Sequence, residues 1–277
     1  MKKINIITLV KNILVFIFGA SFVLVPLWML VINSFKTLGE AKELSLALPT
    51  KWVVLENYIL VLTEGRMARG FVNTLLITVV TITLVIIIAA LAAWVLARSR
   101  SRVFPILYYV IISGIMIPPA VITTIRVLKF LNIYGSLFGL VLFYLGAILP
   151  FTIFYMTGFV KNIPMEIEEA ARIDGASTFG IFGRIILPLM RPIIASSVII
   201  FTLHTWNDFL YPFYFVNDTD NYTMTLGLYN FIAGAYKDIN WHLLFAAIIV
   251  ISAPLVILFF ILQKQILKGI TAGSVKG

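Results

Sequence analysis

The chain has no cysteine and few charged residues, and both scarcities restrict the kind of protein it can be. Without cysteine it cannot form a disulfide, a thiolate metal site or a lipoprotein anchor. Only 12% of its 277 residues are charged, whereas 61% are hydrophobic. A soluble domain of this length does not need so many apolar residues for its core, so lipid must be part of its solvent.

The apolar residues form long runs, without the short alternating segments of a β-barrel. A run of about 18 or more indicates a membrane-crossing helix, because lipid leaves no backbone group unpaired. We therefore predict an all-α integral membrane protein with six transmembrane helices in a single domain, residues 1–277. The predicted spans are 13–32, 71–97, 104–125, 137–160, 192–211 and 241–261. The largest cytoplasmic segment is then 161–191, and 262–277 forms a cytoplasmic tail.

The net charge of +9 is explained by membrane topology, so it does not predict a nucleic-acid partner. With the N-terminus in the cytoplasm, most of the 21 basic residues lie in cytoplasmic segments. The external segments hold about as many acidic as basic residues, as the positive-inside rule expects. We predict that both termini are cytoplasmic, and we interpret the basic run from Arg98 to Arg102 as a topology anchor.

The cytoplasmic segment 161–191 contains signals for two short helices. Pro164 suits a first helical turn, and three glutamates follow where the helix dipole is positive. Gly175 offers a left-handed stop, after which Ser177 or Thr178 can cap a second helix that runs to Pro188. Small residues at the turn permit close backbone approach. This construction is typical of a surface that fits a groove on another protein.

Several motifs carry a family resemblance. Glu169-Ala170-Ala171, Gly175 and Leu187-Pro188 resemble the EAA loop of ABC importer permeases. Asp174-Gly175-Ala176 and Leu187-Pro188-Leu189 are similar to the sugar-importing branch. Motifs along the rest of the chain resemble MalG-type sugar permeases: Leu55-Glu56-Asn57-Tyr58, Phe71-x-Asn73-Thr74, Trp206-Asn207-Asp208-Phe209 and residues 271–277.

The resemblance implies a type I ABC importer permease fold and a subunit that forms half of the translocation pathway of an ATP-driven carbohydrate importer. Its EAA loop would dock on cytoplasmic ATPases through Glu168, Glu169, Ala170, Ala171, Asp174, Gly175, Gly183 and Pro188. Its tail would contact them through Thr271, Ala272, Gly273 and Lys276. The implied location is a bacterial plasma or inner membrane.

The implied partners are a homologous MalF-like sister permease, an ATPase dimer, an extracellular or periplasmic sugar-binding protein, the sugar and membrane lipid, with no nucleic acid. We expect the sugar to be an oligosaccharide. The chain lacks a Gly-x-x-x-x-Gly-Lys-Ser/Thr loop, so ATP and Mg²⁺ belong on a separate ATPase and this chain needs no cofactor. We expect no enzyme activity, and the two histidines, His204 and His242, lack the companions of a metal site.

Five polar residues are candidates for the substrate pathway: Asn73, His204, Trp206, Asn207 and Asp208. For His204, a hydrogen bond between helices is favoured over sugar contact. Trp206, Asn207 and Asp208 either line the pathway or anchor a helix end at the interface. Asn73 and Asn207 have a further interpretation, in which they cap helices or tie them together.

The alternative function is a stand-alone secondary transporter of a polar solute. Such a transporter needs an ionisable relay inside the membrane, and none is evident in the middle of a predicted span. An intramembrane enzyme is a weaker alternative, because its motifs are missing. An ABC permease should copurify with an ATPase, whereas either alternative acts alone.

Overall fold

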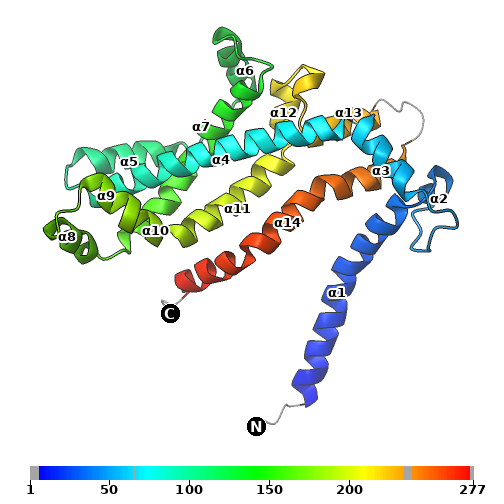
Figure 1. The fold of residues 1–277 in the computed structure, drawn as a ribbon, viewed down its shortest axis with the longest axis horizontal. Helices are drawn as coiled ribbons and strands as arrows, with labels where there is room; N and C mark the ends of the chain where they lie inside the picture. The colour runs from blue at the N-terminus through cyan, green and yellow to red at the C-terminus, as the bar shows by residue number, and fades with distance from the viewer. Residues whose placement is uncertain (1–5, 65, 234–238, 275–277) are drawn as a thin grey trace. The chain divides into compact units, whose positions relative to one another are not determined.

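The computed structural model describes residues 6–64, 66–233 and 239–274. Every regular element in these ranges is a helix, which confirms the all-α prediction (Figure 1). Contacts divide the chain into two compact units. The first comprises Met1–Ala68 and Gly227–Ala253, and the second comprises Arg69–Leu226 and Pro254–Gly277.

The first unit holds α1 (Ile6–Ser34), α2 (Leu38–Lys42), α3 (Val54–Thr63), most of α13 (Met224–Ala233) and the start of α14 (Trp241–Ser274). Polar bonds fix the segment between α1 and α3. Lys36 is only 2% exposed, and its Nζ donates to the Ser45 carbonyl at 2.8 Å and to Asn33 Oδ1 at 3.1 Å. Asn57 donates its amide to the carbonyls of Ser34 and Lys36. The family-like motif around Asn57 therefore has a structural role.

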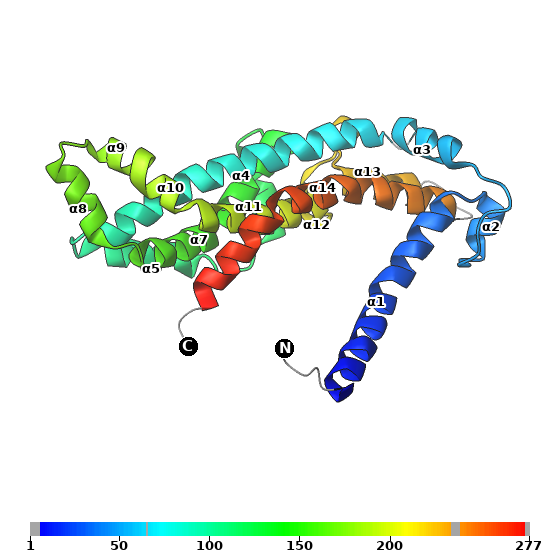
Figure 2. The ribbon, with the colours of Figure 1, turned by 60° about the horizontal axis from the view of Figure 1, so that its bottom comes forward.

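The second unit contains the remaining helices: α4 (Met67–Arg98), α5 (Val103–Ser113), α6 (Val121–Phe130), α7 (Leu137–Lys161), α8 (Met165–Ile173), α9 (Thr178–Ile181), η1 (Phe182–Ile186), α10 (Leu187–Leu189), α11 (Arg191–Asn207), α12 (Leu210–Phe215) and η2 (Thr219–Asn221), with the end of α14. Two apolar cores join α4, α7 and α11. Figure 1 shows α11 running alongside α4 while α7 crosses it, and Figures 1 and 2 show α8 and α9 near the C-terminal end of α4.

Four described helices are long and apolar enough to cross a membrane, at Leu14–Ser34, Met67–Arg98, Leu137–Lys161 and Trp241–Ile261. A fifth crossing is possible if the bent pair Thr178–Leu189 and Arg191–Asn207, with 68° between its parts, counts as one span. These positions match five of the six predicted runs.

The third predicted span, 104–125, is not one helix. The chain leaves the helical conformation after Ser113 and resumes it at Val121, with Pro118 and Pro119 in between. Proline supplies no backbone donor, and the residue before it avoids the helical region. At about 1.5 Å per residue, α5 alone spans roughly 16 Å of a hydrocarbon core of about 30 Å, so a crossing in this region also needs the segment after Ser113 and α6.

By contrast, α4 is a single helix of 32 residues without proline. Its length is about 48 Å, well beyond the roughly 30 Å hydrocarbon thickness. It ends at Arg98, beside the segment 161–191. A continuous helix of this kind can connect that segment directly with the middle of the second unit.

Candidate functional site

Segment 161–191 forms two short helical pieces joined by a tight turn, as predicted. Helix α8 ends at Ile173, and Gly175 adopts a left-handed φ of +80°. The Ser177 hydroxyl then accepts a hydrogen bond from the Gly180 amide at 3.2 Å and caps α9. The second piece reaches Leu189 through η1, a π-helical turn that the sequence did not indicate.

The outer face of this segment is unusually apolar for a charged loop. Ile173 and Phe179, on either side of the glycine turn, are 87% and 84% exposed. Six of the predicted docking residues are exposed or partly exposed beside them: Glu169, Ala170, Ala171, Asp174, Gly175 and Gly183. Pro188 is half-buried in α10. Ile173 and Phe179 were not among the predicted site residues, although their place beside the turn was a usable signal.

Glu168 differs from its neighbours because it points inward and is 3% exposed. One carboxylate oxygen accepts a 2.7 Å hydrogen bond from Arg98 Nε, and the other accepts a 3.0 Å bond from Trp94 Nε1. Arg98 also donates through Nη2 to the Ile163 carbonyl at 2.7 Å. The expectation that Glu168 faces another protein is therefore wrong, since its charge is already neutralised within the chain. Arg98, interpreted as a topology anchor, is its partner.

An apolar core supports this buried ion pair. Three alanines of α4 that are fully buried, Ala89, Ala90 and Ala93, allow α7 and the second loop piece to approach closely. Ile181 and Ile186 pack into the same core. The ring of Trp94 lies 5.3 Å from the ring of Phe182 in η1. The inner side of segment 161–191 is thus fixed to α4, and its outer side is open.

The asparagine candidates act as structural ties. Asn73 donates its amide to the carbonyls of Asp220 and Tyr222 at 2.8 and 3.0 Å, which fixes α4 to the loop after α12. Asn207 donates to the Leu203 carbonyl of its own helix. For both residues, the interpretation as caps or ties agrees with the geometry.

Asp208 is also held by the chain itself. Its Oδ2 accepts a 2.5 Å bond from the buried Tyr144 hydroxyl, and its Oδ1 accepts from the Leu210 amide at 2.9 Å. Thr225 donates to the Asp208 carbonyl at 2.6 Å. These bonds join the end of α11 to α7 and to α13. His204, in contrast, lies exposed on α11, and within the described ranges it forms no hydrogen bond to another helix, contrary to the interpretation that was favoured.

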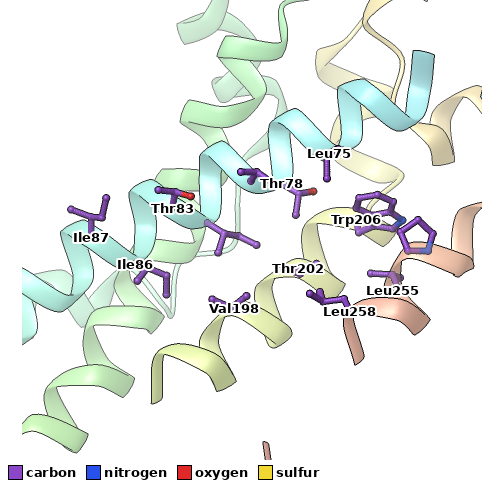
Figure 3. A pocket seen from close by; sticks show the side chains of 13 residues that line it. Leu75, Thr78, Thr83, Ile86, Ile87, Val198, Thr202, Trp206, Leu255 and Leu258 are labelled. Atoms are coloured by element: carbon purple, nitrogen blue, oxygen red, sulfur yellow. The ribbon is translucent and has the colours of Figure 1, made fainter. Parts of the chain in front are cut away.

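A cavity of about 450 Å³ lies between α4, α11 and the middle of α14 (Figure 3). Its walls are apolar apart from three threonines and the indole of Trp206: Leu75, Thr78, Val79, Ile82, Thr83, Ile86, Ile87, Val198, Thr202, Trp206, Pro254, Leu255 and Leu258. Of the five pathway candidates, Trp206 alone contributes to this lining. Its ring also packs edge-on against Phe71 at 5.8 Å.

The tail candidates fall at the end of the described chain. Thr271, Ala272 and Gly273 belong to the final turns of α14. Lys276 lies outside the described residues.

Comparison with known proteins agrees with this architecture. Residues 85–272 match the family of binding-protein-dependent transport system inner membrane components. The chain is 33% identical to the probable ABC transporter permease protein YurM of Bacillus subtilis, over 91% of this chain and 83% of that protein. It is 32% identical to the diacetylchitobiose uptake system permease protein NgcG of Streptomyces coelicolor, over 91% of this chain and 84% of that protein. It is 31% identical to the melibiose/raffinose/stachyose import permease protein MelC of Bacillus subtilis, over 100% of this chain and 98% of that protein.

A solved structure shares the fold. It is a bacterial ABC transporter involved in the import of the acidic polysaccharide alginate, with a TM-score of 0.81 at 22% identity, covering 94% of this chain and 96% of that one. The matched model covers most of the chain, and the relatives align over nearly all of it. The chain therefore belongs to the inner membrane components of binding-protein-dependent transport systems, as a multi-pass permease subunit of an ABC importer.

Proposed function

We propose that this chain forms half of the translocation pathway of a bacterial oligosaccharide importer and docks on a cytoplasmic ATPase pair through segment 161–191. The observation that carries the docking proposal is the two-sided construction of this segment. Its inner side is fixed to α4, whereas its outer side exposes Ile173 and Phe179 around a rigid left-handed turn. Exposed apolar side chains of this size at a fixed turn are typical of a protein interface.

The small and acidic residues beside the turn support the same role. Ala170, Ala171 and Gly175 add little bulk, so the backbone can enter a groove closely. Glu169 and Asp174 add negative charge that a basic groove would recognise. The tail, 262–277, is a second contact with the ATPases under this proposal. The remaining partners are a homologous sister permease and a sugar-binding protein on the outer side.

The substrate proposal rests on relatives and on the cavity. NgcG and MelC are named for diacetylchitobiose and for melibiose, raffinose and stachyose, all of which are short oligosaccharides. In this chain, Trp206 offers a flat ring for stacking on a sugar, and Thr78, Thr83 and Thr202 offer hydroxyls. We assign the cavity wall of α4 and α11 to the pathway. Asn73 and Asp208 hold that wall in place, and both termini lie in the cytoplasm.

The docking proposal is tested by copurification from a cell membrane in mild detergent. Wild-type chain should retain an ATPase and a second permease, identified by mass. Gly175→Asp and Glu169→Lys should lose the ATPase while keeping the sister permease. Arg126→Glu, which reverses an exposed charge on α6, is the matched control and should retain both partners. A wild-type chain that purifies alone would sink the proposal and favour a stand-alone transporter.

A further inference from the structure

The buried contact between Glu168 and α4 is more elaborate than a loop anchor requires. Trp94 and Arg98 are four residues apart, so both side chains leave α4 on the same face, where both meet Glu168. The two donors use different oxygens of one carboxylate. Arg98 then reaches back to the carbonyl of Ile163, just before α8. The start and the middle of the first loop piece are thereby attached to the last turns of α4.

We propose that Trp94, Arg98 and Glu168 form a mechanical tether through which movement of α8 becomes movement of α4. This inference rests on the proposed docking of segment 161–191 on an ATPase. These three are positioning residues, because none of them is on the exposed face that would meet the ATPase. The exposed residues of the segment receive the movement, and the tether passes it into the membrane.

The burial of the contact makes it stiff. Glu168 is 3% exposed and Trp94 is 8% exposed, and the side chain of Arg98 is 12% exposed. An ion pair in water exchanges partners easily, but a buried pair with matched hydrogen bonds leaves an uncompensated charge when it opens. The packing of Trp94 on Phe182 adds an apolar contact to the second loop piece. Pulling α8 away from α4 is therefore strongly unfavourable.

Helix α4 is suited to carry the movement onward. It has no proline from Met67 to Arg98, whereas α7 and α14 contain Pro150 and Pro254. The same helix contributes Leu75, Thr78, Ile82 and Thr83 to the cavity. A displacement at Arg98 would thus reach the cavity wall without a hinge in between. Loss of the tether should leave the docking surface intact but disconnect it from the cavity.

The test uses the complete transporter in proteoliposomes and measures ATP hydrolysed per sugar imported. Glu168→Gln keeps the shape and an acceptor oxygen but removes the charge, and Trp94→Phe keeps an aromatic ring of smaller size but removes the donor. Both should still copurify with the ATPase and keep basal hydrolysis. We expect the ATP-to-sugar ratio to rise about tenfold in Glu168→Gln, equivalent to ~1.4 kcal/mol of lost coupling. Glu166→Gln, an exposed glutamate on the same helix, should match wild type.

A second measurement removes ambiguity from poor folding, because the chain contains no cysteine of its own. In Arg98→Cys/Glu168→Cys, a short bifunctional thiol reagent can join the two positions covalently. Import should be poorly coupled before the reaction and regain the wild-type ratio after it. Each single-cysteine variant treated with the same reagent should show no improvement in the ratio of ATP hydrolysed to sugar imported.

The proposal is overturned if Glu168→Gln imports sugar at the wild-type ratio, or if the verified cross-link does not restore coupling. It is also overturned if the variants assemble normally but differ only in thermal stability, because the pair would then be merely structural. Failure of the docking proposal looks different: wild type itself would neither retain an ATPase nor import sugar with ATP.

Discussion

At the scale of single residues, the hydrogen bond between Tyr144 and Asp208 allows a test of what the Asp208 carboxylate does. It either anchors the end of α11 or belongs to the sugar pathway. Tyr144 is 1% exposed, and its hydroxyl donates to Asp208 at 2.5 Å. Tyr144→Phe should lower the free energy of unfolding by about 1.5–3 kcal/mol, the usual contribution of a hydrogen bond to a charged group. Thermal unfolding of the purified subunit in detergent measures this loss.

Tyr155→Phe is the control for that prediction, since its hydroxyl has no hydrogen bond within the described ranges. It should unfold like wild type. If Tyr144→Phe instead leaves stability unchanged and weakens the apparent affinity for sugar, Asp208 belongs to the pathway and its anchoring role is incorrect.

The sequence was enough to single out these residues by their chemical type. It was not enough to identify the residues that they contact. Three glutamates lie in or next to the first two turns of α8, and nothing in their spacing alone says which one is buried. The partner of Asp208 could not be inferred, since Tyr144 lies 64 residues away.

At the scale of elements, the turn between α8 and α9 depends on a left-handed glycine. Gly175→Ala should destabilise this turn by about 1–2 kcal/mol, because a Cβ disfavours positive φ. Gly175→Asn should cost less, since asparagine tolerates that conformation. Hydrogen exchange of the amides in α8 and α9 reports the difference, and faster exchange is expected in the alanine variant. Equal exchange rates in the alanine and asparagine variants would mean that the turn does not require the left-handed φ of Gly175.

Helix positions in the sequence were predictable where hydrophobicity decides them. The runs at 71–97, 137–160 and 241–261 all lie within helices of the structure, because lipid forces their backbones to pair internally. Interruptions were harder to place. Hydropathy alone joins the two sides of the break after α5, whereas Pro118 and Pro119 predict from the sequence that the helix breaks or kinks there, as the structure shows. The π-helical turn at Phe182–Ile186, whose Phe182 and Ile186 pack into the core shared with α4, has no signal in the hydrophobic periodicity.

At the scale of the whole molecule, the cavity is the feature that transport should depend on most. Thr83 lines it from α4, whereas its neighbour Leu84 is outside the lining. Thr83→Trp should fill part of the volume and reduce sugar uptake severalfold, while the subunit still retains its ATPase. Leu84→Trp introduces the same bulk on another face and should import normally. Equal uptake by the two variants would exclude this cavity from the pathway.

The family was identifiable from sequence because its motifs are distributed along the chain and each has a local physical basis: a turn, a cap or a helix end. The cavity was not identifiable from the sequence, because it requires side chains from α4, α11 and α14 to face one another. Among the five candidate residues, Trp206 is the one that lines it. Polar residues near helix ends attract attention as ligands, yet Asn73 and Asp208 satisfy buried or half-buried partners instead.

The most direct test of the account is ATP-driven uptake in proteoliposomes. The chain is reconstituted with its sister permease, ATPase and sugar-binding protein, and accumulation of a labelled oligosaccharide is followed with hydrolysable or non-hydrolysable nucleotide. We predict accumulation against the gradient only with hydrolysable ATP and all four components. Accumulation by this chain alone, driven by a proton or sodium gradient, would contradict it.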